Sequence, residues 1–184
     1  DQRDVFYYLT LLNENYEHPP MPEGAEEGIL RGMHLIREAG RRKGPRVQLL
    51  GSGAILREVM AGADLLAEDY GVNADVWGVT SFTGLRRMLG DRDGPVVAAT
   101  DYVRAFADGI RSFVPGRYEV LGTDGFGRSD YRVRLRRFFE VDRHHVAVAA
   151  LSSLAREGAI DAAIPAAAIT RYDIDPEAIP PWQR

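Results

Sequence analysis

The sequence predicts an α/β domain of three layers, in which a mostly parallel sheet of about five strands has one antiparallel edge strand and helices cover both faces. Two observations predict this class. Residues 46–71 run in order through a buried strand, a glycine turn and an amphipathic helix, which is half of a βαβ unit. Further apolar runs of strand length at 74–82, 95–100 and 118–121 alternate with helical patterns.

The first unit is the most explicit. Residues 47–50 form an apolar run, and the glycine-rich segment 51–53 interrupts it where the backbone must turn. Over residues 55–70 the apolar side chains recur at spacings of three and four, so one side of a helix faces the core, and Glu58 is expected on the opposite, polar side. Gly71 suits the left-handed position that ends a helix.

The flanking segments complete the sheet. Residues 5–12 have the composition of a strand buried on both faces, whose own sheet is expected to lie elsewhere, and residues 13–24 form a proline-rich linker. Residues 28–38 are expected to form the antiparallel edge strand, as a hairpin onto 47–50. Residues 84–94 are expected to be a charged loop.

Helix caps place the remaining elements. Asp101, then Ser129 or Asp130, and then Asp142 can each cap a helix, and a final helix is expected at 166–172. The inward side chains expected for the first two of these helices are Val103, Phe106, Ile110 and Phe113 or Val114, followed by Leu135, Phe138 and Phe139.

The composition excludes several classes of protein. The chain of 184 residues is 45% hydrophobic and 27% charged, which is typical of a globular domain. A formal net charge of −4 gives no general attraction for nucleic acid or anionic membranes. The absence of cysteine removes disulfides, thiolate catalysis and cysteine metal sites, and fits a reducing cytoplasm. No apolar run approaches the ~20 residues that span a bilayer.

Six motifs occur in a recognisable order: VFYYLTLLNENY, MPEGAEEGI, VQLLGSGAILREV, DYGVNADVWGVTSFT, ATDYVRAFADGIRSFVP and VLGTDGFGRSDYRVRLRRFFEVD. Over almost the whole chain they resemble the C-terminal part of the homodimeric first component of the bacterial pyruvate dehydrogenase complex. The GTDGFGRSD loop is also similar to its counterpart in the wider group of transketolase-like C-terminal domains.

The resemblance implies a parent enzyme that uses thiamine diphosphate and magnesium to decarboxylate pyruvate, and that passes the acetyl group to a lipoyl group. The implied partners are the preceding domains of the same polypeptide, a homodimer mate and the lipoyl-bearing second component, with no nucleic acid and no membrane. The resemblance divides the chain into a remnant of the pyrimidine-binding domain with its linker, 1–24, and a transketolase-like C-terminal domain, 25–184. Family members usually carry a longer segment where this chain has Phe82 to Gly94, so either the loop is trimmed or residues are missing from the sequence.

No catalytic, cofactor-binding or metal-ligating residue can be assigned in this chain. Thiamine diphosphate enzymes of this type need a GDG motif with a downstream asparagine, and a glutamate that protonates the cofactor. Thr123-Asp124-Gly125 offers only a TDG, and residues 129–139 contain no asparagine. We therefore expect the segment alone to be inactive, and its role to be packing within the parent chain and across the homodimer. The alternative, that this chain is an enzyme on its own, requires the chain itself to bind thiamine diphosphate.

A candidate anion or effector site consists of loop residues at the carboxyl ends of two strands, where open α/β folds bind ligands: Gly51, Ser52, Gly53, Asp124, Phe126, Gly127 and Ser129. The glycine turn matches a dinucleotide-binding fingerprint only in part, so a plain strand-to-helix turn is favoured there. The alternative for the second loop is structural, with Phe126 packed beneath the loop and Ser129 capping the next helix.

A candidate docking patch consists of Arg132, Arg136 and Arg137, within a segment that holds several arginines. Such a patch would attract acidic surfaces of a partner. The favoured alternative is a solvated helix, because the arginines lie at several angles around its apolar stripe. His144 and His145 do not suggest a metal site, since neighbouring residues point about 100° apart on a helix and no third ligand is evident.

Overall fold

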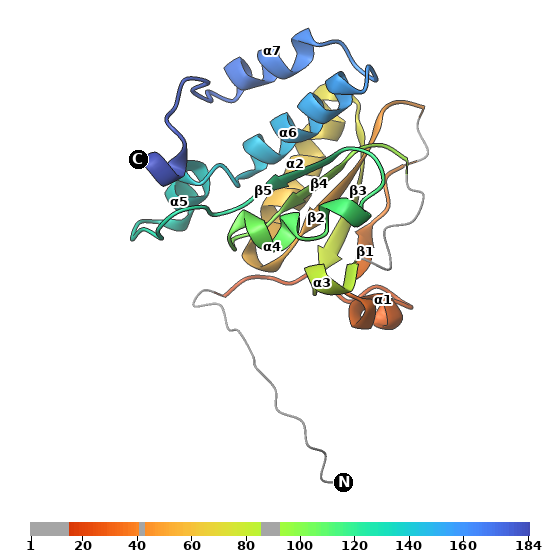
Figure 1. The fold of residues 1–184 in the computed structure, drawn as a ribbon. Coiled ribbons are helices and arrows are strands. Elements are labelled where there is room, and N and C mark those ends of the chain that lie inside the picture. Colours follow the sequence, from red (N-terminus) through yellow and green to blue (C-terminus); the bar gives the residue numbers. More distant parts are fainter. Residues whose placement is uncertain (1–14, 41–42, 86–92) are drawn as a thin grey trace.

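A mixed sheet of five strands lies between two layers of helices in the computed structural model, which describes residues 15–40, 43–85 and 93–184 (Figure 1). The strand order is β1-β3-β2-β4-β5; β2 to β5 are mutually parallel and β1 is antiparallel. The predicted fold class is confirmed. The strands are β1 Met33–Arg37, β2 Arg46–Gly51, β3 Asn73–Val79, β4 Val96–Ala99 and β5 Tyr118–Leu121.

The antiparallel edge strand exists, but its predicted hairpin onto 47–50 is wrong. β1 pairs with β3, with Met33 opposite Val79, and β3 separates β1 from β2. The reason is that β2 occupies the middle of the sheet and pairs on both sides with parallel strands, so neither of its edges is open to β1. The predicted strand at 5–12 lies outside the described residues.

A buried polar network holds the β1–β2 connection against β3. The carboxylate of Asp75 accepts hydrogen bonds from the backbone amide of Ala39 (2.7 Å), from Arg46 (2.8 Å) and from the amide group of Gln48 (2.7 Å). Gln48 in turn accepts a hydrogen bond from the indole of Trp77 at 2.9 Å. Burial would raise the pKa of Asp75, but these hydrogen bonds outweigh it and the pKa is lowered.

The predicted strand, turn and helix around residues 46–71 are confirmed. A 3-10 turn, η1 Gly53–Ile55, leads into α2 Leu56–Tyr70, and Gly71 ends that helix in the left-handed conformation at φ 63°. The approach of helix to strand is close at Gly51, where a Cβ would lie 2.8 Å from the Cα of Leu56. Only glycine fits that position without displacing the helix.

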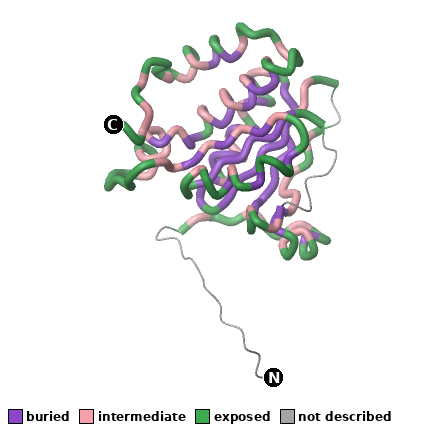
Figure 2. The backbone as a smooth tube through the Cα atoms, in the orientation of Figure 1, coloured by how far each residue is buried: buried purple, intermediate pink, exposed green. Residues whose placement is uncertain are grey.

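The remaining helices divide between the two faces of the sheet. α2 and α6 cover one face and bury Leu49, Val76 and Leu151, while the helical segment between β4 and β5 covers the other (Figures 1 and 2). Figure 2 shows that the sheet between them is buried along most of its length. The bounds are α1 Glu26–Arg31, α3 Phe82–Leu85, α4 Arg104–Asp108, η2 Arg111–Phe113, α5 Arg132–Phe138, α6 Arg143–Arg156, α7 Ala163–Arg171 and η3 Pro181–Gln183.

The helix predicted after Asp101 differs from the expectation. It begins at Arg104 with no capping by its own N-cap side chain, and a 3-10 turn follows it. A 3-10 turn has three residues per turn instead of about 3.6, so the side chains after α4 point in other directions than a continuous α-helix would give them. Only part of the expected inward face is therefore buried. Ile110 and Val114 lie in the core, whereas Val103, Phe106 and Phe113 are exposed. For the next helix the expectation is closer: Phe139 is buried, and Leu135 and Phe138 pack against the core.

The helix α1 was not expected, because Gly28 and Gly32 weaken a helical pattern. Gly28 is nevertheless required, since a Cβ there would lie 2.7 Å from the carbonyl oxygen of Met33 where the chain turns back into β1. Within the described part of the chain, no helix is long and apolar enough to cross a membrane.

Candidate functional site

Three loops meet at the carboxyl edge of the parallel strands. The hydroxyl of Ser52, after β2, donates a hydrogen bond to the hydroxyl of Thr100, after β4, at 2.8 Å. The amide of Thr123, after β5, donates to the carbonyl of Tyr102 at 2.9 Å. The two predicted loops therefore share one edge, and the loop between β4 and α4 joins them.

Asp124 caps the helix that Asp101 was expected to cap. Its carboxylate accepts a hydrogen bond from the amide of Arg104, the first residue of α4, at 3.1 Å. The guanidinium of Arg104 lies 3.9 Å from the other carboxylate oxygen. The amide at a helix start needs a partner outside the helix, and Asp124 supplies it from another loop.

The two structural alternatives for residues 126 and 129 are wrong. Phe126 is 97% exposed and does not pack beneath the loop. Trp182 lies against the loop instead, since a Cβ on Gly125 would be 3.1 Å from the Cα of Trp182. Ser129 does not cap α5, whose N-cap is Tyr131 without a capping side chain.

The glycine turn 51–53 already faces a negative charge. A carboxylate oxygen of Asp101 lies 3.2 Å from where a Cβ of Gly53 would be, and Gly53 has a φ of +54°. Partial burial raises the pKa of Asp101, against the lowering effect of Arg136 and Arg132. The amides at the start of η1 and α2 are thus next to a carboxylate of the protein itself, which disfavours a second anion directly on the turn.

A cavity of about 180 Å³ lies beside this turn and carries an excess of positive charge. It is formed by η1, the loop after β4, the loop after β5, one side of α5 and the residues that follow α5. Its charged side chains are three arginines and one aspartate. The lining residues are Ala54, Ile55, Asp101, Thr123, Gly127, Arg128, Arg132, Leu135, Arg136, Phe139 and Val141.

Arg136, which lines this cavity, also belongs to a buried ion cluster. It lies 2.9 Å from the carboxylate of Glu58, which Arg143 contacts from the other side at 3.0 Å. Burial would raise the pKa of Glu58, but the hydrogen bond and charge of Arg143 and the charge of Arg136 lower it. The expectations of a solvated Glu58 and a solvated arginine helix are therefore wrong at these positions.

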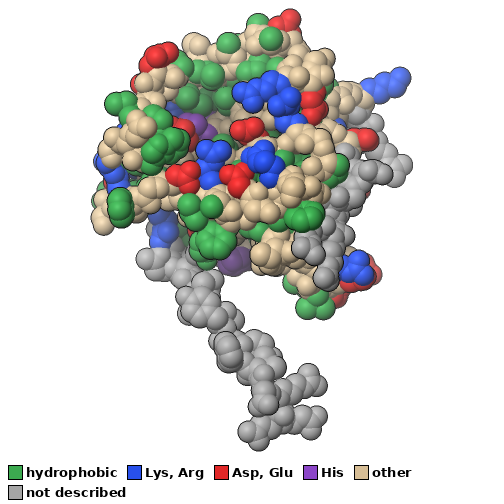
Figure 3. Space-filling model, in the orientation of Figure 1, with side chains coloured by type: hydrophobic (Ala, Val, Ile, Leu, Met, Phe, Trp, Pro, Cys, Tyr) green, Lys and Arg blue, Asp and Glu red, His purple; other side chains and the backbone are tan. Residues whose placement is uncertain are grey.

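The three arginines of the candidate docking patch have different surroundings. Arg136 is in the ion cluster, and Arg137 donates hydrogen bonds to the carbonyls of Tyr172, at 3.0 Å, and Asp173. Arg132 lines the cavity. The docking patch stays a prediction, and all three of its members interact within the chain. On the face drawn in Figure 3, acidic and basic side chains are interspersed.

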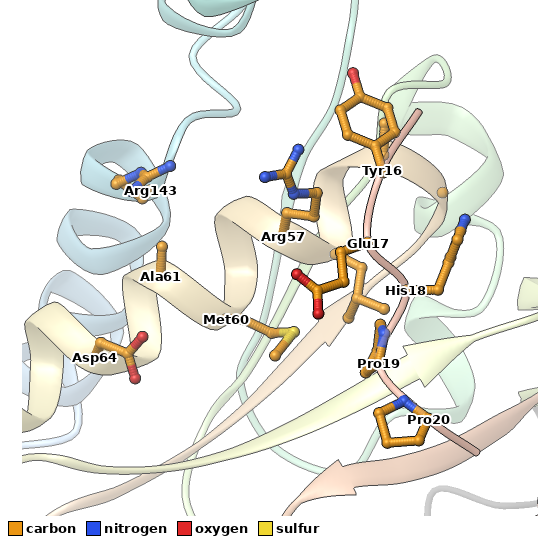
Figure 4. Close-up of a pocket in the computed structure, with 13 residues that line it drawn as sticks. Tyr16, Glu17, His18, Pro19, Pro20, Arg57, Met60, Ala61, Asp64 and Arg143 are labelled. Carbon is orange, nitrogen blue, oxygen red and sulfur yellow. The ribbon is translucent and has the colours of Figure 1, made fainter. Parts of the chain in front are cut away.

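A second and larger cavity, of about 430 Å³, lies between the linker and α2 (Figure 4). Residues 16–20 cross the helix there, and the guanidinium of Arg57 stacks 4.7 Å from the ring centre of Tyr16. The lining charges are balanced, with Arg57 and Arg143 facing Glu17 and Asp64. The charges that line this cavity therefore favour neither an anionic nor a cationic ligand.

His144 and His145 both donate hydrogen bonds to Asp142, the N-cap of α6. Its carboxylate accepts hydrogen bonds from both of their amides, and the Nδ1 of His145 lies 2.7 Å from it. Among the described residues, no group of three or more histidine or acidic side chains is arranged to hold a metal ion.

Sequence reasoning missed two contributors to this region, Asp101 as a cavity residue and Glu58 as a buried charge. Asp101 lies two positions after the end of β4, at the carboxyl edge, and that position was a usable signal. Glu58 gave none, because its partners come from segments 78 and 85 positions away.

A mixed sheet with an antiparallel edge strand and ligand-accessible loops at its carboxyl edge defines an open α/β domain. Residues 32–142 match the family model described as the transketolase-like TK C-terminal domain, and the chain belongs to this family. Solved structures agree at the level of the fold. Transketolase from Campylobacter jejuni superposes with a TM-score of 0.53 at 20% identity, over 74% of this chain and 20% of that one. A transketolase complex from Pichia stipitis gives 0.54 at 16% identity, over 70% and 19%.

Curated relatives are named pyruvate dehydrogenase E1 component. The protein of Cupriavidus necator is 53% identical over 96% of this chain and 22% of its own length, and that of Escherichia coli K12 is 48% identical over 98% and 23%. The chain thus spans less than a quarter of these relatives. The alignment with the Cupriavidus protein runs over 201 positions although this chain has 184 residues, so that relative contains residues that this chain lacks.

Proposed function

We propose that this chain is the C-terminal domain of a pyruvate dehydrogenase E1 component and that it supports catalysis without performing it. The observation that carries the proposal is the 53% identity to such a protein over 96% of the chain. The parent would decarboxylate pyruvate with thiamine diphosphate and magnesium and transfer the acetyl group to a lipoyl-bearing second component, in the cytoplasm. Residues 1–24 would belong to the preceding domain and its linker.

The described residues around the TDG sequence do not fit the cofactor of such a parent. Magnesium is usually bound through one or two carboxylates together with water and phosphate oxygens. Asp124, in the TDG sequence, already accepts the amide of Arg104, and the neighbouring cavity is lined by arginines that repel a cation. Other parts of the parent would therefore bind thiamine diphosphate and magnesium.

The supporting role rests on two acidic side chains that hold helices in position. Glu58 joins α2 to α5 and α6, and Asp142 begins α6. Both carboxylates are buried and paired, so they stabilise helix positions instead of facing a substrate. A rigid domain of this kind can hold its neighbours in the parent chain and across a homodimer.

The test compares the 184-residue chain with its complete reading frame. Each is supplied with thiamine diphosphate, magnesium, pyruvate and a dye that accepts electrons. We expect turnover from the complete protein and none from the chain alone. Turnover by the chain would overturn its supporting role, and a complete protein inactive on pyruvate would overturn the parent activity.

A deletion tests the role in assembly. The complete protein without residues 25–184 is expected to lose its dimer or to melt at a lower temperature, measured by sedimentation and calorimetry. A deletion protein that stays dimeric and equally stable would contradict a role in assembly. A second candidate function, an anion-binding regulatory module, is favoured only by the arginine-lined cavity.

A further inference from the structure

The arginine-lined cavity has the features of a site for a small anion. Arg132 and Arg136 stand one turn apart on α5, so their guanidinium groups come from the same side of the helix. Arg128 reaches the cavity from the preceding loop, and Thr123 adds a hydroxyl-bearing side chain. Guanidinium groups bind phosphate and carboxylate through paired hydrogen bonds, which suits a concave site with several of them.

The cavity has room for such a group. Its volume of about 180 Å³ accommodates a phosphate among the arginine side chains. Gly127 lies on the lining, and a Cβ there would meet nothing within 4 Å, so the cavity is not closed at this point.

We propose that this cavity binds a single phosphate group, either as inorganic phosphate or as the phosphate of a small metabolite. Arg132 and Arg136 are the principal donors. The site differs from the predicted glycine-turn site, because Asp101 occupies the surroundings of Gly53 and only Gly127 of the predicted residues lines the cavity. The proposal names the ligand class of the second candidate function, and it does not rest on the activity of the parent, since it concerns binding and not turnover.

Asp101 is the internal competitor of the ligand. Its carboxylate lines the same cavity and interacts with the charges of Arg132 and Arg136. A bound phosphate must therefore share these guanidinium groups with a like charge. Removal of that charge should strengthen binding.

Arg136 connects the cavity to the linker. One of its terminal nitrogens contacts Glu58, and the other donates a hydrogen bond to the hydroxyl of Tyr16 at 3.2 Å. A phosphate that draws this second nitrogen competes with Tyr16. Occupancy of the cavity therefore weakens the attachment of the linker to α5, and it offers a route by which a metabolite can act on the segment that leads into the domain.

Calorimetric titration of the 184-residue chain with inorganic phosphate, at constant ionic strength in a phosphate-free buffer, tests the site. We expect saturable binding that Arg132→Gln weakens about tenfold, because it removes a charge-assisted hydrogen bond. Arg134→Gln is the matched control: Arg134 lies on the same helix, is largely exposed and does not line the cavity. It should leave the affinity unchanged.

Two further variants sharpen the result. Asp101→Asn should bind phosphate more tightly, and Arg132→Lys, which keeps the charge but loses the planar fork, should fall between the wild type and Arg132→Gln. Circular dichroism confirms that each variant is folded. Absence of saturable binding, or equal losses in Arg132→Gln and Arg134→Gln, would overturn the site.

The chemical class is tested with methyl phosphate and ADP. Methyl phosphate should bind about as well as inorganic phosphate, and ADP should gain nothing from its nucleoside. A nucleotide that binds much more tightly than either would overturn the single-phosphate assignment. For the linker, Tyr16→Phe removes the competing acceptor and should tighten phosphate binding about twofold; an unchanged affinity would overturn the coupling.

Discussion

The carboxylate of Glu58 and the guanidinium of Arg136 meet at 2.9 Å although 78 positions separate them in the sequence. Arg143 binds the same carboxylate from α6. One buried acidic side chain thus fixes the relative positions of α2, α5 and α6. The cavity and the linker both depend on this point, because Arg136 contacts each of them.

Replacement of Glu58 by glutamine should destabilise the domain strongly. The variant keeps the shape of the side chain but leaves two guanidinium groups without their buried counter-charge, and we expect a loss of about 3 kcal/mol in the free energy of unfolding. Urea denaturation measures this loss. Glu68→Gln, at an exposed position of the same helix, should change the free energy by less than about 0.5 kcal/mol. Equal effects of the two variants would refute the role of the ion cluster.

Asp142 should make the domain sensitive to acid. Burial would raise the pKa of its carboxyl, but the hydrogen bond and charge of His145, together with His144, lower the pKa to about 2. Arg137 adds a positive charge 3.6 Å away. Because the folded pKa lies below the unfolded one, the stabilisation is complete above about pH 4 and is lost as the pH falls toward 2. A shift of this size corresponds to about 2 kcal/mol.

The variant Asp142→Asn separates this charge effect from capping. Asparagine still accepts the amides that begin α6, so we expect the acid-dependent part of the unfolding free energy to shrink by about 2 kcal/mol while the helix persists. Asp161→Asn is the control, since Asp161 caps the amide of Ala163 at an exposed position. Unfolding curves that fall equally between pH 4 and pH 2 in wild type and Asp142→Asn would contradict the assignment.

The left-handed end of α2 gives a conformational prediction. Gly71 has φ 63°, and a Cβ there would meet no atom within 4 Å, so Gly71→Ala changes backbone energy without a clash. We expect a loss of about 1 kcal/mol in thermal or urea unfolding. Gly40→Ala is the control. A Cβ at Gly40 would also meet no atom within 4 Å, but Gly40 does not have a left-handed φ. Its effect should be near zero, and similar losses in both variants would contradict the explanation.

The contact between Asp124 and α4 gives a fourth prediction. Asp124→Ala removes the acceptor of the Arg104 amide and should cost about 1 kcal/mol of unfolding free energy, while Asp124→Asn should retain most of it. Glu177→Ala, at an exposed position, serves as the comparison. Should the Glu177 variant lose as much stability as Asp124→Ala, the capping role would be refuted.

Local patterns predicted the elements whose structure is decided locally. The run at 47–50, the glycine turn and the apolar stripe of α2 each depend on neighbouring residues, and all three are confirmed. Asp142 was correctly assigned as a cap because its partners are the next amides along the chain. These features need no knowledge of distant segments.

The errors concern partners that are distant in the sequence. The edge strand pairs with β3 because β2 has no free edge, and only the complete strand order reveals this. Asp124, not Asp101, caps α4, and it lies 20 positions beyond the amide that it accepts, so the local pattern gave no sign of it. The position of Glu58 likewise follows from arginines on other helices.

β3 lies in the interior of the sheet, between the edge strand β1 and the middle strand β2, and this position affects its hydrogen exchange. Every one of its seven residues is buried, and it has a hydrogen-bonded neighbour on each side. Its amide protons can reach solvent only when the whole domain unfolds, whereas those of β1 and β5 also exchange through local fraying at the margins of the sheet. Deuterium should therefore enter from both margins and replace the β3 amides last.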